Sequence, residues 1–167
     1  VTIPDGVTSL GGSAFERCSS LQKIVVPSTV TSVGNGVFSG CSSLESADIL
    51  AQVEELPIDM FRVCRKLKSV KLPDTITKID NSAFYYCESL ESIDIPDSVL
   101  TLGYLAFNNC SSLTDVKLSN NLITIGPETF ANCSQLESIV IPDSVNTIKN
   151  LAFDGCTLLE NITIPAS

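Results

Sequence analysis

Every phenylalanine and every cysteine of this chain recurs at a fixed interval of 23 residues. The phenylalanines are Phe15, Phe38, Phe61, Phe84, Phe107, Phe130 and Phe153. The cysteines are Cys18, Cys41, Cys64, Cys87, Cys110, Cys133 and Cys156. A leucine keeps the same interval from Leu21 to Leu159. Chance does not place whole residue types in one register along 167 residues, so the fold must be built from about seven copies of one unit.

Each unit contains a short segment in which apolar and polar positions alternate. In the unit that starts at Leu21, Ile24 and Val26 point to one side, and Lys23 and Val25 point to the other. This period of two predicts a half-buried strand of about four or five residues. In six of eight instances a proline follows and ends the strand, because proline has no N–H to donate. These prolines are Pro4, Pro27, Pro73, Pro96, Pro142 and Pro165.

The remainder of each unit predicts a second extended piece and then a helical turn. Residues 30–34, with two valines and a closing glycine, favour a short extended piece that ends in a glycine turn. The apolar residues near the phenylalanine fall at i, i+1, i+4 and i+7, which is one face of a helical turn. In the first unit they are Ala14, Phe15, Cys18 and Leu21. Candidate N-caps of such turns are Ser13, Asp59 and Ser82.

A unit of this size cannot bury its own apolar side, but stacked units can. Each unit then adds one parallel strand at about 4.8 Å from its neighbour. In such a stack the phenylalanine, cysteine and leucine columns run through a shared interior. Residues 1–167 are expected to form a single domain. We expect it to be a segment of a longer array, because neither end carries the polar cap that solenoids need.

The repeat resembles a known family. The strand pattern L-x-x-L-x-L, the proline after it and the tail I-G-x-x-A-F-x-x-C resemble the BspA-like leucine-rich repeat family over the whole chain. A closely matching unit reads Leu90-x-x-Ile93-x-Ile95-Pro96-x-x-Val99-x-x-Leu102-Gly103-x-x-Ala106-Phe107-x-x-Cys110. One repeat departs from the pattern at Ala47, Leu50, Pro57, Met60 and the run 62–71, so regular turn geometry is in question there. The asparagine column of other leucine-rich repeats is replaced by Thr29, Gln52, Thr75, Ser98, Asn121 and Ser144.

The resemblance implies both a fold and a class of function. The fold is an α/β repeat, a right-handed leucine-rich-repeat solenoid of about seven coils, each with a short parallel strand and a short helical turn. The function is that of a non-enzymatic protein–protein interaction module at the cell surface or secreted, an adhesin-type domain that binds host, matrix or neighbouring-cell proteins. One alternative is a structural spacer or self-assembling array that stacks end to end. Another is an intracellular scaffold, which seven unpaired thiols would suit.

Composition argues against several other classes. The chain has no histidine, which removes the commonest general base and any Ser-His-Asp triad, so we expect no enzyme and no catalytic residues. The net charge of −9 opposes binding to nucleic acid. No apolar run approaches the roughly 20 residues that span a bilayer, so we expect no membrane insertion by this segment.

The cysteine and aspartate columns invite a metal site, but their spacing favours structural roles. No C-x₂₋₄-C cluster is present, and stacked cysteines would carry parallel Cβ vectors that oppose disulfide formation. The thiols are therefore expected to be buried and structural. The aspartates after the strand prolines are Asp5, Asp74, Asp97 and Asp143. The Pro-Asp-Ser/Thr sequence is ordinary turn chemistry, so neither calcium nor any other cofactor is expected.

The outward-facing strand residues form the first candidate binding surface, on the concave strand face. They are Lys23, Val25, Ser46, Asp48, Ser69, Lys71, Ser92, Asp94, Asp115, Lys117, Ser138 and Val140. The central charges Asp48, Lys71, Asp94 and Lys117 alternate in sign, so neighbouring strands either neutralise one another or present a patterned surface. The face holds no arginine or aromatic residue, so a partner would bind it through shape and many weak polar contacts.

A basic patch forms the second candidate surface. It comprises Arg62, Arg65, Lys66, Lys68 and Lys71, five of the ten basic residues of the chain. It is either a site for an acidic partner or a solvated turn in which Glu45 and Glu91 flank Lys68. The three tyrosines, Tyr85, Tyr86 and Tyr104, are expected near neighbouring turns, where they form either an outer aromatic patch or simple amphipathic cover.

Overall fold

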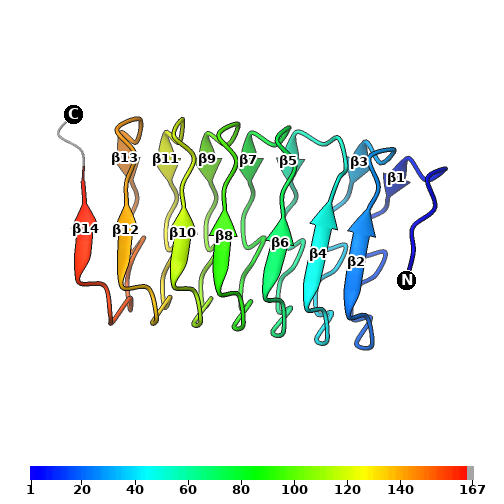
Figure 1. Ribbon diagram of the computed structural model, residues 1–167, viewed down its shortest axis with the longest axis horizontal. Helices are drawn as coiled ribbons and strands as arrows, with labels where there is room; N and C mark the ends of the chain where they lie inside the picture. The colour runs from blue at the N-terminus through cyan, green and yellow to red at the C-terminus, as the bar shows by residue number, and fades with distance from the viewer. Residues whose placement is uncertain (165–167) are drawn as a thin grey trace.

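The computed structural model describes residues 1–164, and in these residues the chain is a right-handed parallel β-solenoid of about seven coils of about 23 residues. The coils stack side by side, and each contributes one strand to each of two rows (Figure 1). The predicted parallel repeat architecture is confirmed. Pro165, one of the predicted strand-ending prolines, lies outside the described residues.

The longer strands form the row that faces the viewer in Figure 1. They are β2 (Lys23–Val26), β4 (Ser46–Ile49), β6 (Ser69–Lys71), β8 (Ser92–Asp94), β10 (Asp115–Lys117), β12 (Ser138–Val140) and β14 (Asn161–Thr163). Parallel pairing joins β2, β4 and β6, then β8 and β10, and then β12 and β14. Along β2, Ile24 and Val26 are buried, and Lys23 and Val25 are exposed, so the predicted alternation is confirmed.

The second row contains the short extended pieces that the valine and glycine pattern predicts. These are β1 (Ser9–Leu10), β3 (Ser32–Val33), β5 (Glu55–Leu56), β7 (Lys78–Ile79), β9 (Thr101–Leu102), β11 (Thr124–Ile125) and β13 (Thr147–Ile148). Five of them, β5 to β13, form one continuous parallel sheet. After β3 the chain needs a glycine, because a Cβ on Gly34 would lie 2.4 Å from the backbone nitrogen of Gly12 in the preceding coil.

The predicted helical turn is wrong, because residues 1–164 contain no helix. The segment around each phenylalanine, here called the turn segment, is a succession of tight turns. Within it the N–H of Cys18 donates to the carbonyl of Phe15 (3.2 Å), whereas the N–H of Phe15 donates to Val37 in the next coil (2.9 Å). Inter-coil hydrogen bonds therefore take the place of the i→i−4 bonds of an α-helix.

The backbone conformation explains why a helix cannot form in the turn segments. Two residues of each segment have positive φ, and a left-handed residue interrupts a right-handed helix. The first column is Ser13, Gly36, Asp59, Ser82, Leu105, Glu128 and Leu151. The second column is Arg17, Gly40, Val63, Tyr86, Asn109, Asn132 and Gly155. The predicted N-caps Ser13, Asp59 and Ser82 are thus wrong, since an N-cap has extended rather than left-handed geometry.

The repeat that departs from the family pattern nonetheless has regular turn geometry. Its turn segment carries positive φ at Asp59 (58°) and Val63 (60°), in the same two columns as every other coil. Its strand β4 pairs in parallel with both β2 and β6, and β5 pairs with β7. However, β5 does not pair with β3, and the second row is interrupted there, because Pro57 has no N–H to make the bond that Gly34 and Asp80 make to the preceding coil. The inter-coil hydrogen bonds hold this backbone path even where side-chain types change.

The buried columns run through the interior as predicted, except in the first coil, where Cys18 is exposed. Neighbouring phenylalanine rings stack with centroids 5.0–5.7 Å apart, from Phe15 to Phe153. Phe84 and Cys87 are fully buried. From Cys41 to Cys156, each thiol donates to the carbonyl of the phenylalanine 26 residues earlier, at 3.1–3.3 Å. All seven cysteines are free, and the thiols from Cys41 to Cys156 serve as packing and hydrogen-bonding groups.

Hydroxyl groups occupy part of the column in which other leucine-rich repeats place asparagine. Thr29 donates to the carbonyl of Val7 at 3.0 Å, and Thr75 donates to Val53 at 2.8 Å. The hydroxyl of Ser98, in the same column, is buried without a hydrogen-bond partner. Short hydroxyl side chains thus link adjacent coils in several repeats, although the column is not uniform.

Val63 provides a direct test of the left-handed columns. A β-branched residue is strained at φ 60°, whereas asparagine tolerates this conformation and occupies the same column at residues 109 and 132. We expect Val63→Asn to raise the free energy of unfolding by about 1 kcal/mol, as measured by urea denaturation. The control is Val25→Asn, an exposed strand position, where the lower β propensity of asparagine should reduce stability. If Val63→Asn destabilises the protein as much as Val25→Asn does, residue 63 does not have the left-handed conformation.

Candidate interaction surface

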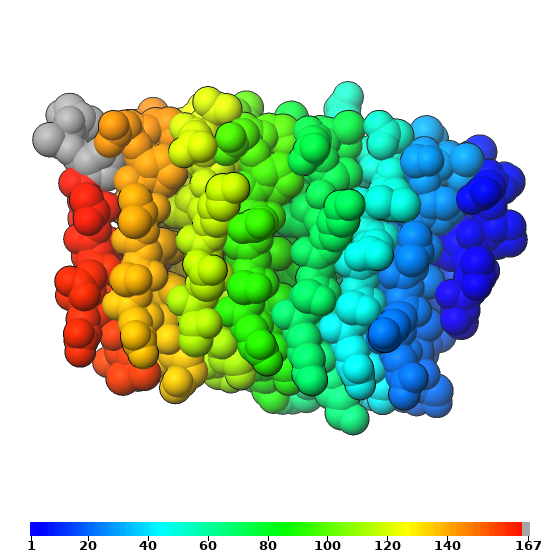
Figure 2. Space-filling view, in the orientation of Figure 1, coloured from blue at the N-terminus to red at the C-terminus, as the bar shows by residue number. Residues whose placement is uncertain are grey.

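The candidate residues of the strand face lie in two outward columns. One column contains residues 23, 46, 69, 92, 115 and 138, and the other contains residues 25, 48, 71, 94, 117 and 140. Within each hydrogen-bonded pair, residues of one column are register partners, as Val25, Asp48 and Lys71 are across β2, β4 and β6. All are exposed except Ser46, which is half-buried. In Figure 2 the coils cross this face as adjacent ridges.

The charged column places opposite charges on neighbouring strands. Asp48 is the register partner of Lys71, and Asp94 is the register partner of Lys117. Among residues 1–164, however, no ion pair within 4.0 Å joins these side chains. The ladder is thus balanced in charge without close pairing, and its charged groups remain accessible to a partner.

Two depressions follow one another along this face. The first has a volume of about 570 Å³ and spans β6, β8 and β10, with Lys71, Asp94 and Lys117 in its lining. The second has a volume of about 500 Å³ and extends over β10 and β12 to Val140. Asp94 and Lys117 line both depressions. The two therefore adjoin, and together they form a shallow groove along the stack whose lining combines charged and apolar side chains.

At the edge of this groove, Asp97 forms hydrogen bonds within the fold. Its carboxylate accepts the backbone N–H of Asn120 (2.9 Å) and the side-chain amide of the same residue (3.3 Å). These hydrogen bonds from Asn120 lower the pKa of Asp97. In the described part of the chain, no group of three or more metal-ligating side chains is placed to hold an ion.

The structure does not bring the five residues of the basic patch together. Lys71 lies on the strand face in β6, whereas Arg62 and Arg65 belong to the preceding turn segment. Lys66 and Lys68 are exposed between these two surfaces. The backbone N–H of Lys68 donates to the carbonyl of Glu45 at 2.9 Å, which places these residues on adjacent coils as predicted.

The two arginines instead pair with tyrosines of the next coil. The guanidinium carbon of Arg62 lies 5.7 Å from the ring centroid of Tyr85, and that of Arg65 lies 5.4 Å from Tyr86. The two tyrosine rings meet edge to face, with centroids 4.6 Å apart. Sequence reasoning treated arginines and tyrosines separately and missed this arrangement, although Tyr85 follows Arg62 by one full 23-residue period.

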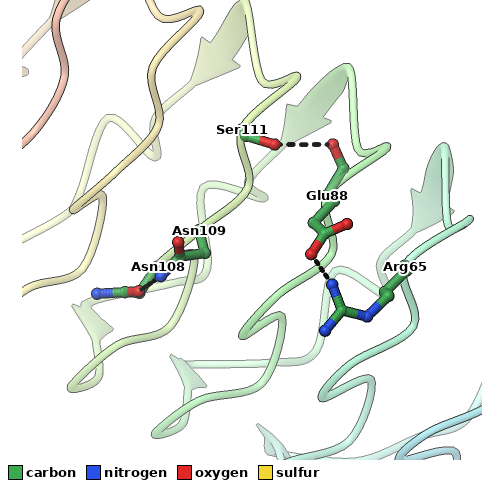
Figure 3. A network of polar contacts seen from close by, with 5 residues as sticks. All are labelled: Arg65, Glu88, Asn108, Asn109 and Ser111. Carbon is green, nitrogen blue, oxygen red and sulfur yellow. Dashed lines mark hydrogen bonds and ion pairs between the residues drawn. The ribbon is translucent and has the colours of Figure 1, made fainter.

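Glu88 anchors one side of this arrangement across three coils (Figure 3). Its carboxylate pairs with the guanidinium of Arg65, which also lies one period away. Its backbone carbonyl accepts the hydroxyl of Ser111 at 3.5 Å in the following coil. Beside this network the side-chain amide of Asn109 donates to the side-chain carbonyl of Asn108. The orientation of Arg65 is therefore defined by both a carboxylate and an aromatic ring.

Burial makes the interior thiols poor nucleophiles. It raises the pKa of Cys41 to about 11 and that of Cys64 to about 12. The same cause raises the pKa of Cys87, Cys110 and Cys133 well above the usual value. These thiols stay protonated at neutral pH, in agreement with the structural role predicted from their spacing.

Comparison with known proteins identifies related repeats. Residues 1–111 and 54–167 match the model of the BspA type leucine rich repeat region, in six copies. The chain is similar to the crystal structure of a leucine-rich repeat protein from Bacteroides ovatus, at 34% identity and a TM-score of 0.93, over 99% of this chain and 45% of that one. It is also similar to a leucine-rich repeat protein from Eubacterium ventriosum, at 30% identity and a TM-score of 0.58, over 99% of this chain and 37% of that one. The T. pallidum leucine rich repeat protein is similar at 29% identity and a TM-score of 0.69, over 97% of this chain and 67% of that one.

This chain thus spans less than half the length of the first two of these structures. No curated protein matches it. The described residues include no helix with the length and apolarity that a bilayer crossing requires.

The buried thiols predict a specific loss of stability in alkali. Below pH 9 both the folded and the unfolded thiol of Cys64 are protonated, so its contribution is constant. As the pH rises from 9 towards 12, only the unfolded thiol ionises, and stability falls by about 1.4 kcal/mol per pH unit for this one group. Cys64→Ala should therefore flatten the alkaline decline in urea denaturation under reducing conditions.

Cys18, which is exposed, provides the matched control for this experiment. Cys18→Ala should leave the dependence of stability on pH unchanged. An equal flattening by both alanine substitutions, or by neither, would contradict the assignment of the alkaline decline to buried thiols.

Proposed function

This chain belongs to the BspA-type leucine-rich repeat family, and we propose that it is a non-enzymatic module that binds a protein partner across its strand face. The observation that carries the proposal is the groove over β6 to β12, into which the unpaired charges Lys71, Asp94 and Lys117 project. Such a row of rigid, exposed and charge-patterned strands provides specificity through many polar contacts.

We further propose that the module acts at the cell surface or after secretion, as an adhesin-type domain that binds a host or matrix protein. The family resemblance supports this setting. The support is an analogy, since one repeat scaffold serves many different roles. The unpaired charges of Lys71, Asp94 and Lys117 in the groove support an interaction whose specificity depends on charge. In such an interface the removal of a single charge near the centre has a large effect.

A second candidate function is end-to-end self-assembly, because a stack of equivalent coils can be continued by further coils in the same register. A second copy stacked in this way would continue the apolar columns. In that case light scattering shows a mass that rises with concentration, whereas a strict monomer at high concentration excludes this function.

Charge reversal within the groove tests binding through the strand face. Lys117→Glu should lower capture of matrix proteins from a basement-membrane extract by about tenfold, because it makes the centre of the groove wholly acidic. The matched control is Lys149→Glu, an exposed lysine just after β13, which should retain capture. Surface plasmon resonance measures the capture of matrix proteins by each immobilised variant and by the unchanged chain. Equal retention or equal loss in the two variants argues against the strand face.

A further inference from the structure

The residue types that dominate protein-binding hot spots gather away from the strand face. All three tyrosines and two of the three arginines of the chain lie on the turn segments of three consecutive coils. We name these five residues the arginine–tyrosine cluster: Arg62, Arg65, Tyr85, Tyr86 and Tyr104. Tyrosine and arginine are the types most enriched at energetically important interface positions.

The cluster holds its arginines in place while leaving donors free. Arg62 approaches Asp59 only through Nε, at 3.9 Å, and Arg65 contacts Glu88 through Nη1. Within the described residues, the other guanidinium N–H groups have no hydrogen-bond partner, and both side chains are about half exposed. Since the tyrosine rings already order the guanidinium planes, binding of a carboxylate by these groups loses less side-chain entropy.

The backbone fixes the direction of Tyr86. This residue has φ 58° in a column that holds glycine or asparagine in four of the seven coils. The inter-coil hydrogen bond from the N–H of Tyr86 to the carbonyl of Asn108 (2.9 Å) holds this conformation, as the equivalent bonds do in the preceding coils of the column. Desolvation also raises the pKa of the neighbouring Tyr85 above an ordinary value that already keeps its hydroxyl protonated at neutral pH.

The local charge favours a short acidic ligand over a long polyanion. Lys66 and Lys68 are exposed next to the arginines, and they add positive charge to a chain whose net charge is −9. Glu45 and Glu91 occupy the coils on either side of Lys68, so the positive region is narrow and has acidic borders. A continuous polyanion would meet these borders, whereas a peptide with a few carboxylates would not.

We propose that the arginine–tyrosine cluster is a docking site for a short acidic and apolar segment of a partner protein. The carboxylates of the segment pair with the free guanidinium N–H groups, and its apolar side chains pack on the tyrosine rings (Figure 3 shows the Arg65 side of the site). Because the cluster lies on the turn segments, it is separate from the strand-face groove.

Fluorescence anisotropy with a labelled peptide of alternating glutamate and leucine tests this site directly. The intact chain should bind the peptide at low ionic strength and should bind the glutamine analogue at least tenfold more weakly. The double variant Arg62→Gln/Arg65→Gln should lose at least tenfold in affinity. Arg62→Lys/Arg65→Lys should lose most of this affinity as well, because lysine keeps the charge but not the planar fork.

Arg17→Gln is the matched control, since Arg17 lies on a turn segment outside the cluster with its side chain 84% exposed. It should bind the peptide like the unchanged chain, and so should Lys117→Glu, which separates this site from the strand-face proposal. Circular dichroism of each variant checks that the fold is retained. Undiminished binding by the double glutamine variant, or equal affinity for the glutamine peptide, overturns the proposal. So does a heparin oligosaccharide that binds the cluster more tightly than the acidic peptide.

Discussion

The structure depends on the backbone hydrogen bonds that each turn segment makes to the coil after it. In the central coils, Ser82 donates to Tyr104 at 2.8 Å, Phe84 donates to Ala106 at 2.8 Å and Tyr86 donates to Asn108 at 2.9 Å. These N–H groups have no carbonyl within their own coil to satisfy them, and burying them unpaired is costly. A coil is therefore complete only when a neighbour is present, and the fold is necessarily a stack.

The stack also determines how binding surfaces arise in this protein. Residues 23 positions apart lie side by side, so a change at one position alters one member of a column while the backbone stays the same. The strand face shows this in the alternation of Asp94 and Lys117 on paired strands. The arginine–tyrosine cluster shows it across turn segments, where Arg62 lies over Tyr85 of the next coil. Both surfaces are thus combinations of side chains on one constant scaffold, and each can change independently.

The sequence predicts the stack, its two extended pieces and the buried columns, because all of these follow from the period and the alternation. It fails on the turn segment, because the spacing of Phe15, Cys18 and Leu21 suits a succession of tight turns as well as a helix. Left-handed residues such as Leu105 and Glu128 carry no sequence signal, since inter-coil bonds impose their conformation. The outward columns of the strand face are predictable from alternation, whereas the grouping of arginines with tyrosines requires comparison of residues one period apart.

Scalar couplings across hydrogen bonds, measured by NMR between amide nitrogens and carbonyl carbons, test the central claim most directly. If each coil is completed by its neighbour, the nitrogen of Phe84 couples to the carbonyl carbon of Ala106, and the nitrogen of Phe61 couples to that of Ala83. A helical turn would instead couple Phe84 to Asp80 and Phe61 to Pro57, four residues earlier. That second pattern would contradict the account, because each turn segment would then satisfy its own backbone.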